Sequence, residues 1–216
     1  MNEIKNEAGQ TEKEFLASYD PGKYKHPSVT ADVAAFTNGG KKLQVLLIKR
    51  KNHPFIGEWA LPGGFVEMDE DLPDAARREL KEETGISADV IELGVYGKPG
   101  RDPRDRVITV AFIALLREAR AIPKADDDAA DARFFDVTIG RNNKGNKEDY
   151  NITLINEDIT LKIIASIRRQ KSLLEPYKID TIKGDLASDH STILLDAILR
   201  LYMYANKYDF KQLGVK

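Results

Sequence analysis

The sequence predicts an α+β fold, and three observations support this prediction. Short apolar runs bounded by Gly, Pro and Asn indicate several β-strands. A capped segment at 72–84 and a second periodic segment from about 188 to 208 indicate two helices. No internal repeat, low-complexity tract or Pro/Ser-rich linker divides the 216 residues. We therefore expect a single domain over 27–216, preceded by a lead-in over 1–26.

The composition excludes several classes of protein. Lys and Arg number 33 against 35 Asp and Glu, so the net charge of −2 gives no overall electrostatic argument for nucleic acid. We expect no nucleic-acid partner, although a local basic patch stays open. The absence of cysteine excludes disulfides, Cys-ligated zinc, iron–sulfur clusters and thiol nucleophiles. No apolar stretch is long enough to span a bilayer and the N-terminus has no signal-like apolar region. These features predict a cytoplasmic protein with no membrane partner.

The first half of the chain contains a short helix and several strands. Residues 12–18 can form one helical turn or two within the polar lead-in. Apolar runs at 28–36 and 42–50 flank Asn-Gly-Gly and predict a hairpin. The segment 59–66 predicts a strand that a Pro-Gly-Gly turn interrupts. Trp59 is the only tryptophan, and we expect it to pack in the core.

The second half predicts more strands and a final helix. Strands are expected at about 88–97, 107–117 and 133–138, followed by a polar loop at 140–149. Residues 151–155 and 161–167 predict a strand pair, although the second run could equally be helical. A short strand is expected at 177–183. Ser188 or Asp189 caps a helix that extends to about Tyr208, and its apolar face consists of Ile193, Leu194, Ala197, Ile198, Leu201 and Ala205.

The helix at 72–84 carries an acidic face. Asp71 is a suitable N-cap and Gly85 a suitable residue after the last turn. Glu79, Glu82 and Glu83 stand at i, i+3 and i+4, so they share an arc of about 100°. Three carboxylates on one face repel one another unless a cation neutralises them. Mg²⁺ is the natural counterion of such an oxygen cluster.

Neighbouring residues strengthen this interpretation. Arg78 stands four residues before Glu82 and can hold that carboxylate in position. The carbonyl of Gly63 can add a metal ligand, because glycine permits close approach of the backbone. Glu70 precedes the helix and can reach the same cluster. The alternative is a solvated acidic helix, which leaves the Pro-Gly-Gly turn, Glu70 and the closing glycine without explanation.

The pattern resembles the Nudix box, the 23-residue signature of the Nudix hydrolases. The fixed positions of the box are occupied by Gly64, Glu70, Arg78, Glu79, Leu80, Glu82, Glu83, Gly85 and Ile86. This resemblance implies an α/β/α sandwich with a mixed β-sheet, here closed by the long C-terminal helix. It also implies hydrolysis of a nucleoside diphosphate linked to another group.

The resemblance further implies metal-assisted hydrolysis. Glu79, Glu82 and Glu83 would hold Mg²⁺, or Mn²⁺ in its place, with Glu70 as an auxiliary ligand. The general base would come from the box or from a later loop. Glu148 and Glu157 are the loop candidates.

Two stretches narrow the substrate. The stretches 24–36 and 101–106 resemble an ADP-ribose pyrophosphatase-like subgroup, which also includes bacterial transcription regulators. Arg101, Arg104 and Arg106 suit a diphosphate, since guanidinium groups bind phosphate oxygens through forked donors. Arg50, at the end of the second strand, is a further candidate. The alternatives are a solvated turn in which neighbouring aspartates pair with the arginines, and a solvated strand end for Arg50.

Two functions of different classes follow. The first is a pyrophosphohydrolase acting on a small nucleotide, ADP-ribose or a nucleotide sugar. The second is a ligand-sensing regulator that binds its ligand without cleaving it. Only the eight residues 209–216 follow the last predicted helix, too few for a winged-helix DNA-binding module.

His190 is expected to pack or cap the start of that helix. An additional segment at about 140–187 exceeds a minimal Nudix core and, with the family resemblance, predicts a homodimer.

Overall fold

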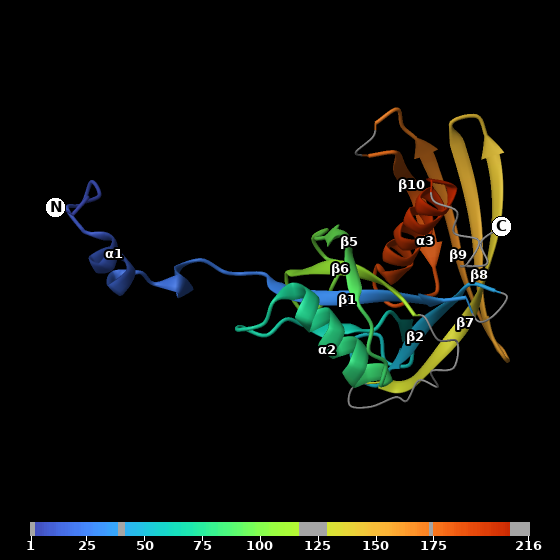
Figure 1. Ribbon diagram of the computed structural model, residues 1–216, viewed down its shortest axis with the longest axis horizontal. Coiled ribbons are helices and arrows are strands. Elements are labelled where there is room, and N and C mark those ends of the chain that lie inside the picture. Colours follow the sequence, from blue (N-terminus) through green and yellow to red (C-terminus); the bar gives the residue numbers. More distant parts are fainter. Residues whose placement is uncertain (1–2, 39–41, 117–128, 173–174, 208–216) are drawn as a thin grey trace.

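The computed structural model describes residues 3–38, 42–116, 129–172 and 175–207, and it confirms the α+β class (Figure 1). Three α-helices, a short 3-10 helix and ten strands occur within these ranges. They are α1 (Glu12–Ser18), η1 (Pro21–Lys23), β1 (Ser28–Thr37), β2 (Gln44–Arg50), β3 (Trp59–Ala60), β4 (Gly63–Phe65), α2 (Leu72–Thr84), β5 (Val90–Tyr96), β6 (Val107–Leu115), β7 (Ala129–Lys144), β8 (Lys147–Asn156), β9 (Ile159–Arg169), β10 (Tyr177–Gly184) and α3 (His190–Lys207).

The described strands form one mixed sheet, as expected. Its order is β10-β9-β8-β7-β2-β1-β6-β5, with β3 paired to β2 and β4 paired to β1. β1 and β6 run parallel, and the other described pairs are antiparallel. The short strand β4 brings the box glycines against β1, where Gly64 is the partner of Ala31. The predicted hairpin of β1 and β2 is confirmed, and its turn at 39–41 lies outside the described residues.

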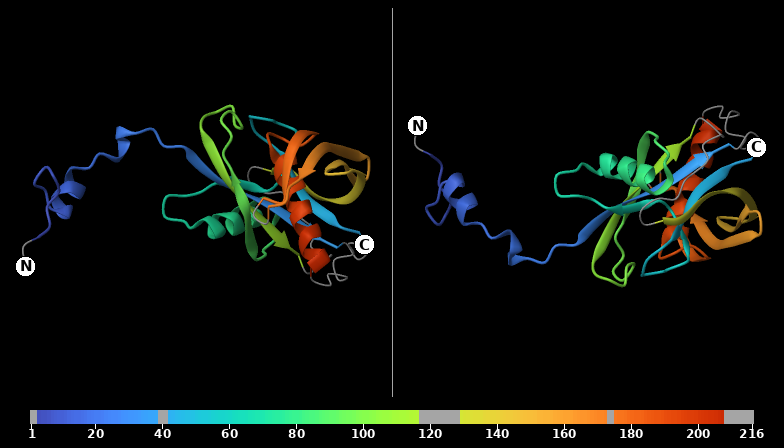
Figure 2. Two further views of the ribbon diagram at one scale, coloured as in Figure 1. Left: turned by 90° about the horizontal axis from the view of Figure 1, so that it is seen from above. Right: turned by 90° about the horizontal axis from the view of Figure 1, so that it is seen from below.

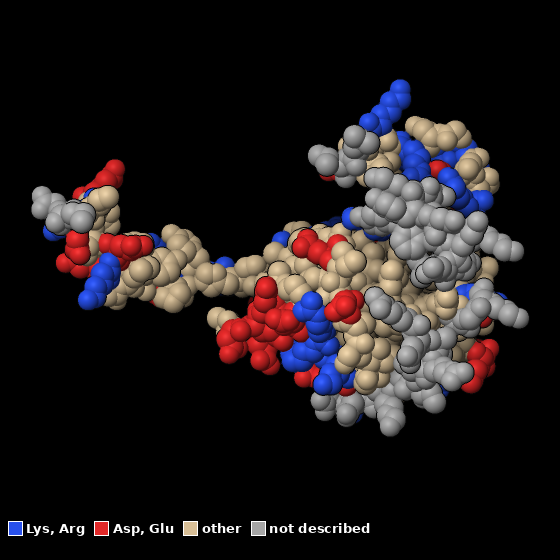
Figure 3. All heavy atoms as spheres, in the orientation of Figure 1, with Lys and Arg blue, Asp and Glu red and all other residues tan. Residues whose placement is uncertain are grey.

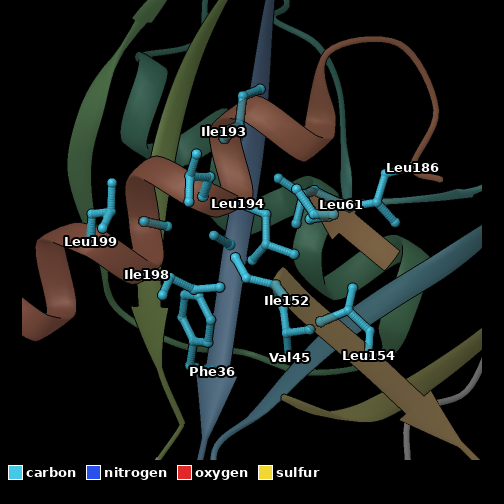
Figure 4. Packing of buried hydrophobic residues seen from close by; sticks show 14 of the residues in the cluster. Phe36, Val45, Leu61, Ile152, Leu154, Leu186, Ile193, Leu194, Ile198 and Leu199 are labelled. Atoms are coloured by element: carbon cyan, nitrogen blue, oxygen red, sulfur yellow. The ribbon is translucent and has the colours of Figure 1, made fainter. Parts of the chain in front are cut away.

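The sheet separates two hydrophobic layers, because successive strand residues point to opposite faces. In β1, Val33 and Ala35 pack in the cluster that contains Leu80 of α2. Ala34 and Phe36 pack instead in the larger cluster under α3. Figure 4 shows this second layer, where side chains of α3 meet β1, β2 and β8. The two helices therefore cover opposite faces of the sheet, which confirms the sandwich (Figure 1).

Helix α2 begins and ends where its capping residues predict. The carboxylate of Asp71 accepts the backbone N–H of Leu72 at 2.8 Å. At the other end, Gly85 has φ of 71°, a left-handed conformation that suits glycine. Leu80 is completely buried under the helix. The helix is thus fixed in register, and its carboxylate face has a defined position relative to the sheet.

The prediction of a polar loop at 140–149 is wrong. These residues form the end of β7 and the start of β8, which pair from Asp136–Ile155 down to Lys144–Lys147. Only Gly145 and Asn146 remain for the turn, and Gly145 has φ of 70°. Polar residues occupy these strands because one side of the hairpin faces solvent, while Tyr150 and Ile152 pack in the core. The strand pair at 151–155 and 161–167 and the strand at 177–183 are confirmed as parts of β8, β9 and β10.

The lead-in extends away from the sheet. Helix α1 has a complete capping box between Thr11 and Glu14 but buries none of its residues. In Figures 1 and 2 this segment projects from the N-terminal end of β1 in all three views. Among the described helices, none combines the length and the hydropathy needed to cross a bilayer.

Candidate active site

The turn between β3 and β4 places bare backbone against α2. The N–H of Gly63 donates to Oε2 of Glu83 at 2.8 Å. A Cβ atom at Gly64 would collide with the carboxylate of Glu79, and one at Gly63 would collide with Asp32. The two glycines are therefore required by close packing, since any side chain would displace an acidic group.

Arg78 connects a carboxylate of the loop before α2 with two carboxylates of the helix. Its guanidinium donates to Glu70 at 2.8 Å from both Nε and Nη2, to Glu79 at 2.8 Å and to Glu82 at 2.9 Å. It also donates to the carbonyl of Phe65 at 3.0 Å. One cation thus ties the loop before α2 to two residues of the helix face. In Figure 3 acidic side chains gather at the start of α2 with basic side chains beside them.

The electrostatic environment favours binding of a cation. Burial raises the pKa of Glu83 to about 8, and the nearby charges of Glu79 and Asp32 add to the effect, while the Gly63 N–H opposes it. Burial also raises the pKa of Glu79, although Arg78 opposes this shift. The pKa of Glu70 is lowered by its hydrogen bonds from Arg78. The raised pKa values of these two carboxylates indicate negative charge that the neighbouring donors do not fully compensate.

The donor atoms at this site are carboxylate oxygens, a type that suits a hard divalent ion. Among the described residues, Oε2 of Glu79, Oε1 of Glu82 and Oε1 of Glu83 take part in no hydrogen bond, so each carboxylate keeps one available oxygen. Oxygen donors of this type are those that Mg²⁺ and Mn²⁺ prefer. In the described parts of the chain, no three acidic or histidine side chains are arranged to hold a metal ion. Metal binding would therefore require these side chains to turn toward a common point.

A pocket of about 310 Å³ opens beside the box. This volume is at the lower end of those that bind small molecules. The pocket lies between β1, the loop after β2, the Gly63–Gly64 turn, the loop before β6 and the start of α3. Its polar and charged lining residues include Thr30, Asp32, Arg50, Asn52, His53, Glu83, Arg101, Asp102, Arg104, Ser188 and His190.

Three of the four predicted arginines line this pocket. Arg50 donates from Nε to the carbonyl of Pro54 at 2.8 Å, which holds the loop after β2. Arg101 is buried and donates to both carboxylate oxygens of Asp189 at 2.7 and 2.9 Å. Arg104 pairs with Asp102 at 2.7 Å and lies 5.0 Å from the ring centroid of Phe65. This pair agrees with the alternative prediction, in which an aspartate of the same turn pairs with the arginine.

The fourth predicted arginine, Arg106, does not line the pocket. Its Nη1 donates to the carbonyl of Val107 at 3.4 Å, and Nη2 lies beside Gly97 at the end of β5. Position 106 directly precedes β6, so its side chain follows the strand instead of turning toward Arg101. Pro103 belongs to the same turn but does not line the pocket either.

Neither loop candidate for the general base lies at the pocket. Glu148 is buried on β8, where it accepts hydrogen bonds from Arg141, Arg169 and Tyr150. These donors lower its pKa to about 2 against the effect of burial. Glu157 is exposed at the turn between β8 and β9, 3.7 Å from Arg133. Neither residue lines the pocket, and Glu148 lies in the segment that was expected to be a loop and forms a hairpin instead.

Two residues outside the box line the pocket, although the sequence did not assign them to the site. Asp32 is a single acidic residue within the apolar run of β1, and it lines the pocket. An acidic residue within an apolar run was the feature of the sequence that could have identified Asp32 as a site residue. His190 is buried at the first turn of α3, as expected, and its Nδ1 accepts the N–H of Leu61 at 3.0 Å. Burial lowers the pKa of His190.

Trp59 packs edge-on against Phe135 with centroids 4.9 Å apart, which confirms its place in the core.

The comparison with known proteins now identifies the family. Residues 26–154, more than half of the chain, match the NUDIX domain. The chain belongs to the Nudix family. The acidic residues 126–128, which precede β7 in the sequence, lie outside the described residues.

Relatives within the Nudix family include enzymes and regulators. An ADP-ribose pyrophosphatase of Methanocaldococcus jannaschii is 46% identical over 129 residues, which cover 58% of this chain and 73% of that protein. An ADPR responsive transcriptional repressor, NtrR, of Acinetobacter baylyi is 42% identical over 109 residues, or 49% of this chain and 44% of the repressor. The NUDIX domain of Shewanella oneidensis NrtR, solved with ADP ribose, has a TM-score of 0.63 at 29% identity and covers 89% of this chain and 99% of that one.

Proposed function

We propose that this Nudix protein is a metal-dependent hydrolase that cleaves the pyrophosphate of ADP-ribose or of a nucleotide sugar. One observation carries the proposal: Gly63, Gly64 and Glu83 line the same pocket as Arg50 and Arg101. Groups suited to a cation and groups suited to a phosphate anion therefore face one space. The similarity to an ADP-ribose pyrophosphatase supports this choice of substrate.

In this proposal the box residues hold the metal. Glu79, Glu82, Glu83 and the carbonyl of Gly63 are its ligands, and Mg²⁺ or Mn²⁺ is the ion. When bound, such an ion offsets the charge of a diphosphate and lowers the pKa of an attacking water. Arg78 orients Glu79 and Glu82 through the hydrogen bonds described above.

The remaining side chains bind the substrate and move the proton. Arg50 donates to the diphosphate oxygens, Arg101 lines the same pocket, and Arg104 lies at the Phe65 side of the pocket. A carboxylate of the box takes the proton of the attacking water, since the two later glutamates lie elsewhere. Arg106 has no part in this step because it does not line the pocket.

The test is turnover by the purified chain in Mg²⁺ or Mn²⁺ with ADP-ribose, NADH and a panel of nucleotide sugars. We expect cleavage of at least one compound to a nucleoside monophosphate and a phosphorylated product. Glu83→Gln is the matched inactive variant, and Glu67→Gln, an exposed acid before α2, is the control. A folded wild-type protein that cleaves none of these compounds would contradict the proposal.

A second candidate is a regulator that binds ADP-ribose without cleaving it. The similarity to the NtrR repressor and to the ADP ribose complex of the NrtR domain favours it. Calorimetry with ADP-ribose, combined with the turnover assay, separates the two candidates. Binding without turnover, together with a DNA shift in a gel assay, would establish the regulator.

We also propose that the protein is a homodimer. The segment after residue 154 extends beyond the matched domain, and it exposes Ile155 and Ile164 on the sheet. Light scattering at micromolar concentration tests this, and a monomeric mass would contradict it.

A further inference from the structure

One carboxylate of the pocket has no hydrogen-bond donor among the described residues. Asp32 lies on β1 with its side chain 7% exposed, and it lines the pocket. Nη2 of Arg101 lies 3.8 Å from its Oδ2, and Nε2 of His190 lies 3.9 Å from its Oδ1. Both distances exceed those of hydrogen bonds. A buried carboxylate with open acceptor positions is costly, so this arrangement points to a donor supplied by a ligand.

The two neighbours of Asp32 are themselves donors. Nδ1 of His190 accepts the N–H of Leu61, so the neutral ring carries its hydrogen on Nε2, on the side of Asp32. Arg101 is held from behind by two hydrogen bonds to Asp189. At this wall the pocket therefore presents an acceptor with two oxygens between two N–H donors.

We propose that Asp32 binds a vicinal diol of the substrate, namely the two hydroxyls of a ribose, with His190 and Arg101 donating to the hydroxyl oxygens. This inference rests on the proposed function. It identifies a second part of the substrate, besides the pyrophosphate, that the protein recognises. A hydroxyl both donates and accepts, which matches an acceptor flanked by donors. An acidic side chain that accepts from ribose hydroxyls is a known solution in nucleotide sites.

Other ligand groups fit this wall less well. A phosphate oxygen only accepts and is repelled by the carboxylate. An amino group only donates and leaves the N–H groups of His190 and Arg101 without an acceptor. A metal ion at Asp32 would lie beside the guanidinium of Arg101, a neighbouring positive charge.

The test compares ADP-ribose with its two monodeoxy analogues, each lacking the 2-hydroxyl of one ribose. For the wild type we expect kcat/KM to fall by about 10- to 100-fold with one analogue, because the loss leaves a charged acceptor unsatisfied. In Asp32→Asn the amide offers one acceptor instead of two, so this discrimination is expected to fall to about 3-fold or less. Asp102→Asn is the control: it removes a charge from the same pocket, but its carboxylate pairs with Arg104, so the wild-type ratio is expected to persist.

Binding constants measured by calorimetry for the same compounds keep the test independent of turnover. If no compound is cleaved but the wild type still binds ADP-ribose better than one analogue, the hydrolase proposal fails and the diol inference stands. The inference is overturned if the wild type binds ADP-ribose and both analogues equally, or binds none of them. It is also overturned if Asp32→Asn keeps the wild-type ratio and instead raises the Mg²⁺ concentration needed for activity. A thermal melt verifies folding, and Asp32→Glu is the second variant, which keeps the charge but moves it by one methylene.

Discussion

The carboxylate of Glu79 occupies the space that a Cβ atom on Gly64 would fill. This contact joins the turn after β3 to the middle of α2. It explains why a glycine stands at the start of the box and a glutamate fifteen positions later. The position of the acidic face thus depends on the absence of a side chain on the neighbouring strand.

Gly64→Ala is expected to lower activity much more than stability. The added methyl group displaces Glu79, and the flexible end of that side chain can move at a cost of about 1 kcal/mol or less. We expect kcat to fall by at least about 10-fold, since small displacements of catalytic groups are costly. Gly94→Ala is the control, because no atom lies within 4 Å of its added Cβ. Equal loss of activity in both variants would contradict this explanation.

The metal-free protein is expected to lose stability as the pH rises between about 4.5 and 8. The pKa of Glu83 is about 8 in the folded protein and near its ordinary value of 4.5 when unfolded, so the folded state binds the extra proton. The stabilisation that comes from protonated Glu83 is therefore present below about pH 4.5 and is lost as the pH rises through 8. The free energy of unfolding falls by at most about 1.4 kcal/mol per pH unit over this range. This slope is measured by denaturant titrations at several pH values in a buffer that contains a metal chelator. Glu83→Gln is expected to flatten it, and an unchanged slope would show that another group is responsible.

Arg78→Lys is expected to weaken metal binding while the fold persists. A lysine ammonium is a point charge and cannot reproduce the forked bonds to Glu70, Glu79 and Glu82. The Mg²⁺ concentration for half-maximal activity is expected to rise by about 10-fold or more. Arg77→Lys is the matched control, since this neighbour pairs with the exposed Asp74. A shift of the same size in the control would contradict the role of Arg78.

Glu148→Gln is expected to destabilise the protein by about 1–3 kcal/mol at pH 7 without abolishing activity. Its carboxylate pairs with Arg141 at 2.8 Å and Arg169 at 2.9 Å. Because its pKa is lowered to about 2, the stabilisation is present above about 4.5 and is lost as the pH falls toward 2. Urea titrations at pH 7 and pH 3 should show a smaller difference between variant and wild type at the lower pH. Loss of turnover in a folded variant would restore Glu148 as a candidate base.

A chain starting at residue 27 is expected to keep its fold and its activity. We propose 27–216 as the domain, because α1 buries none of its residues and projects from the sheet. The melting temperature of the shortened chain should lie within a few degrees of that of the full chain. A large decrease would show that the lead-in packs on the domain in solution.

Local patterns in the sequence predicted the elements that depend on neighbouring residues. The bounds of α2 follow from Asp71 and Gly85, because capping is a matter of adjacent backbone groups. The hairpin of β7 and β8 could not be predicted in this way. Its buried Glu148 becomes acceptable only through Arg141 and Arg169, and Arg169 comes from another strand.

The sequence by itself determined the acidic face of Glu79, Glu82 and Glu83 and the family to which the chain belongs, since the first depends on spacing along one helix and the second on the fixed spacing of residues 64–86. Only the tertiary structure decided what surrounds that face. It brought Asp32 of β1 and His190 of α3 to within 3.9 Å, although the two residues are far apart in the sequence. It also directed Arg101 into the pocket and left Arg106 outside it. The physical reason is that the direction of a side chain outside a regular helix depends on the sheet and loops that pack against it.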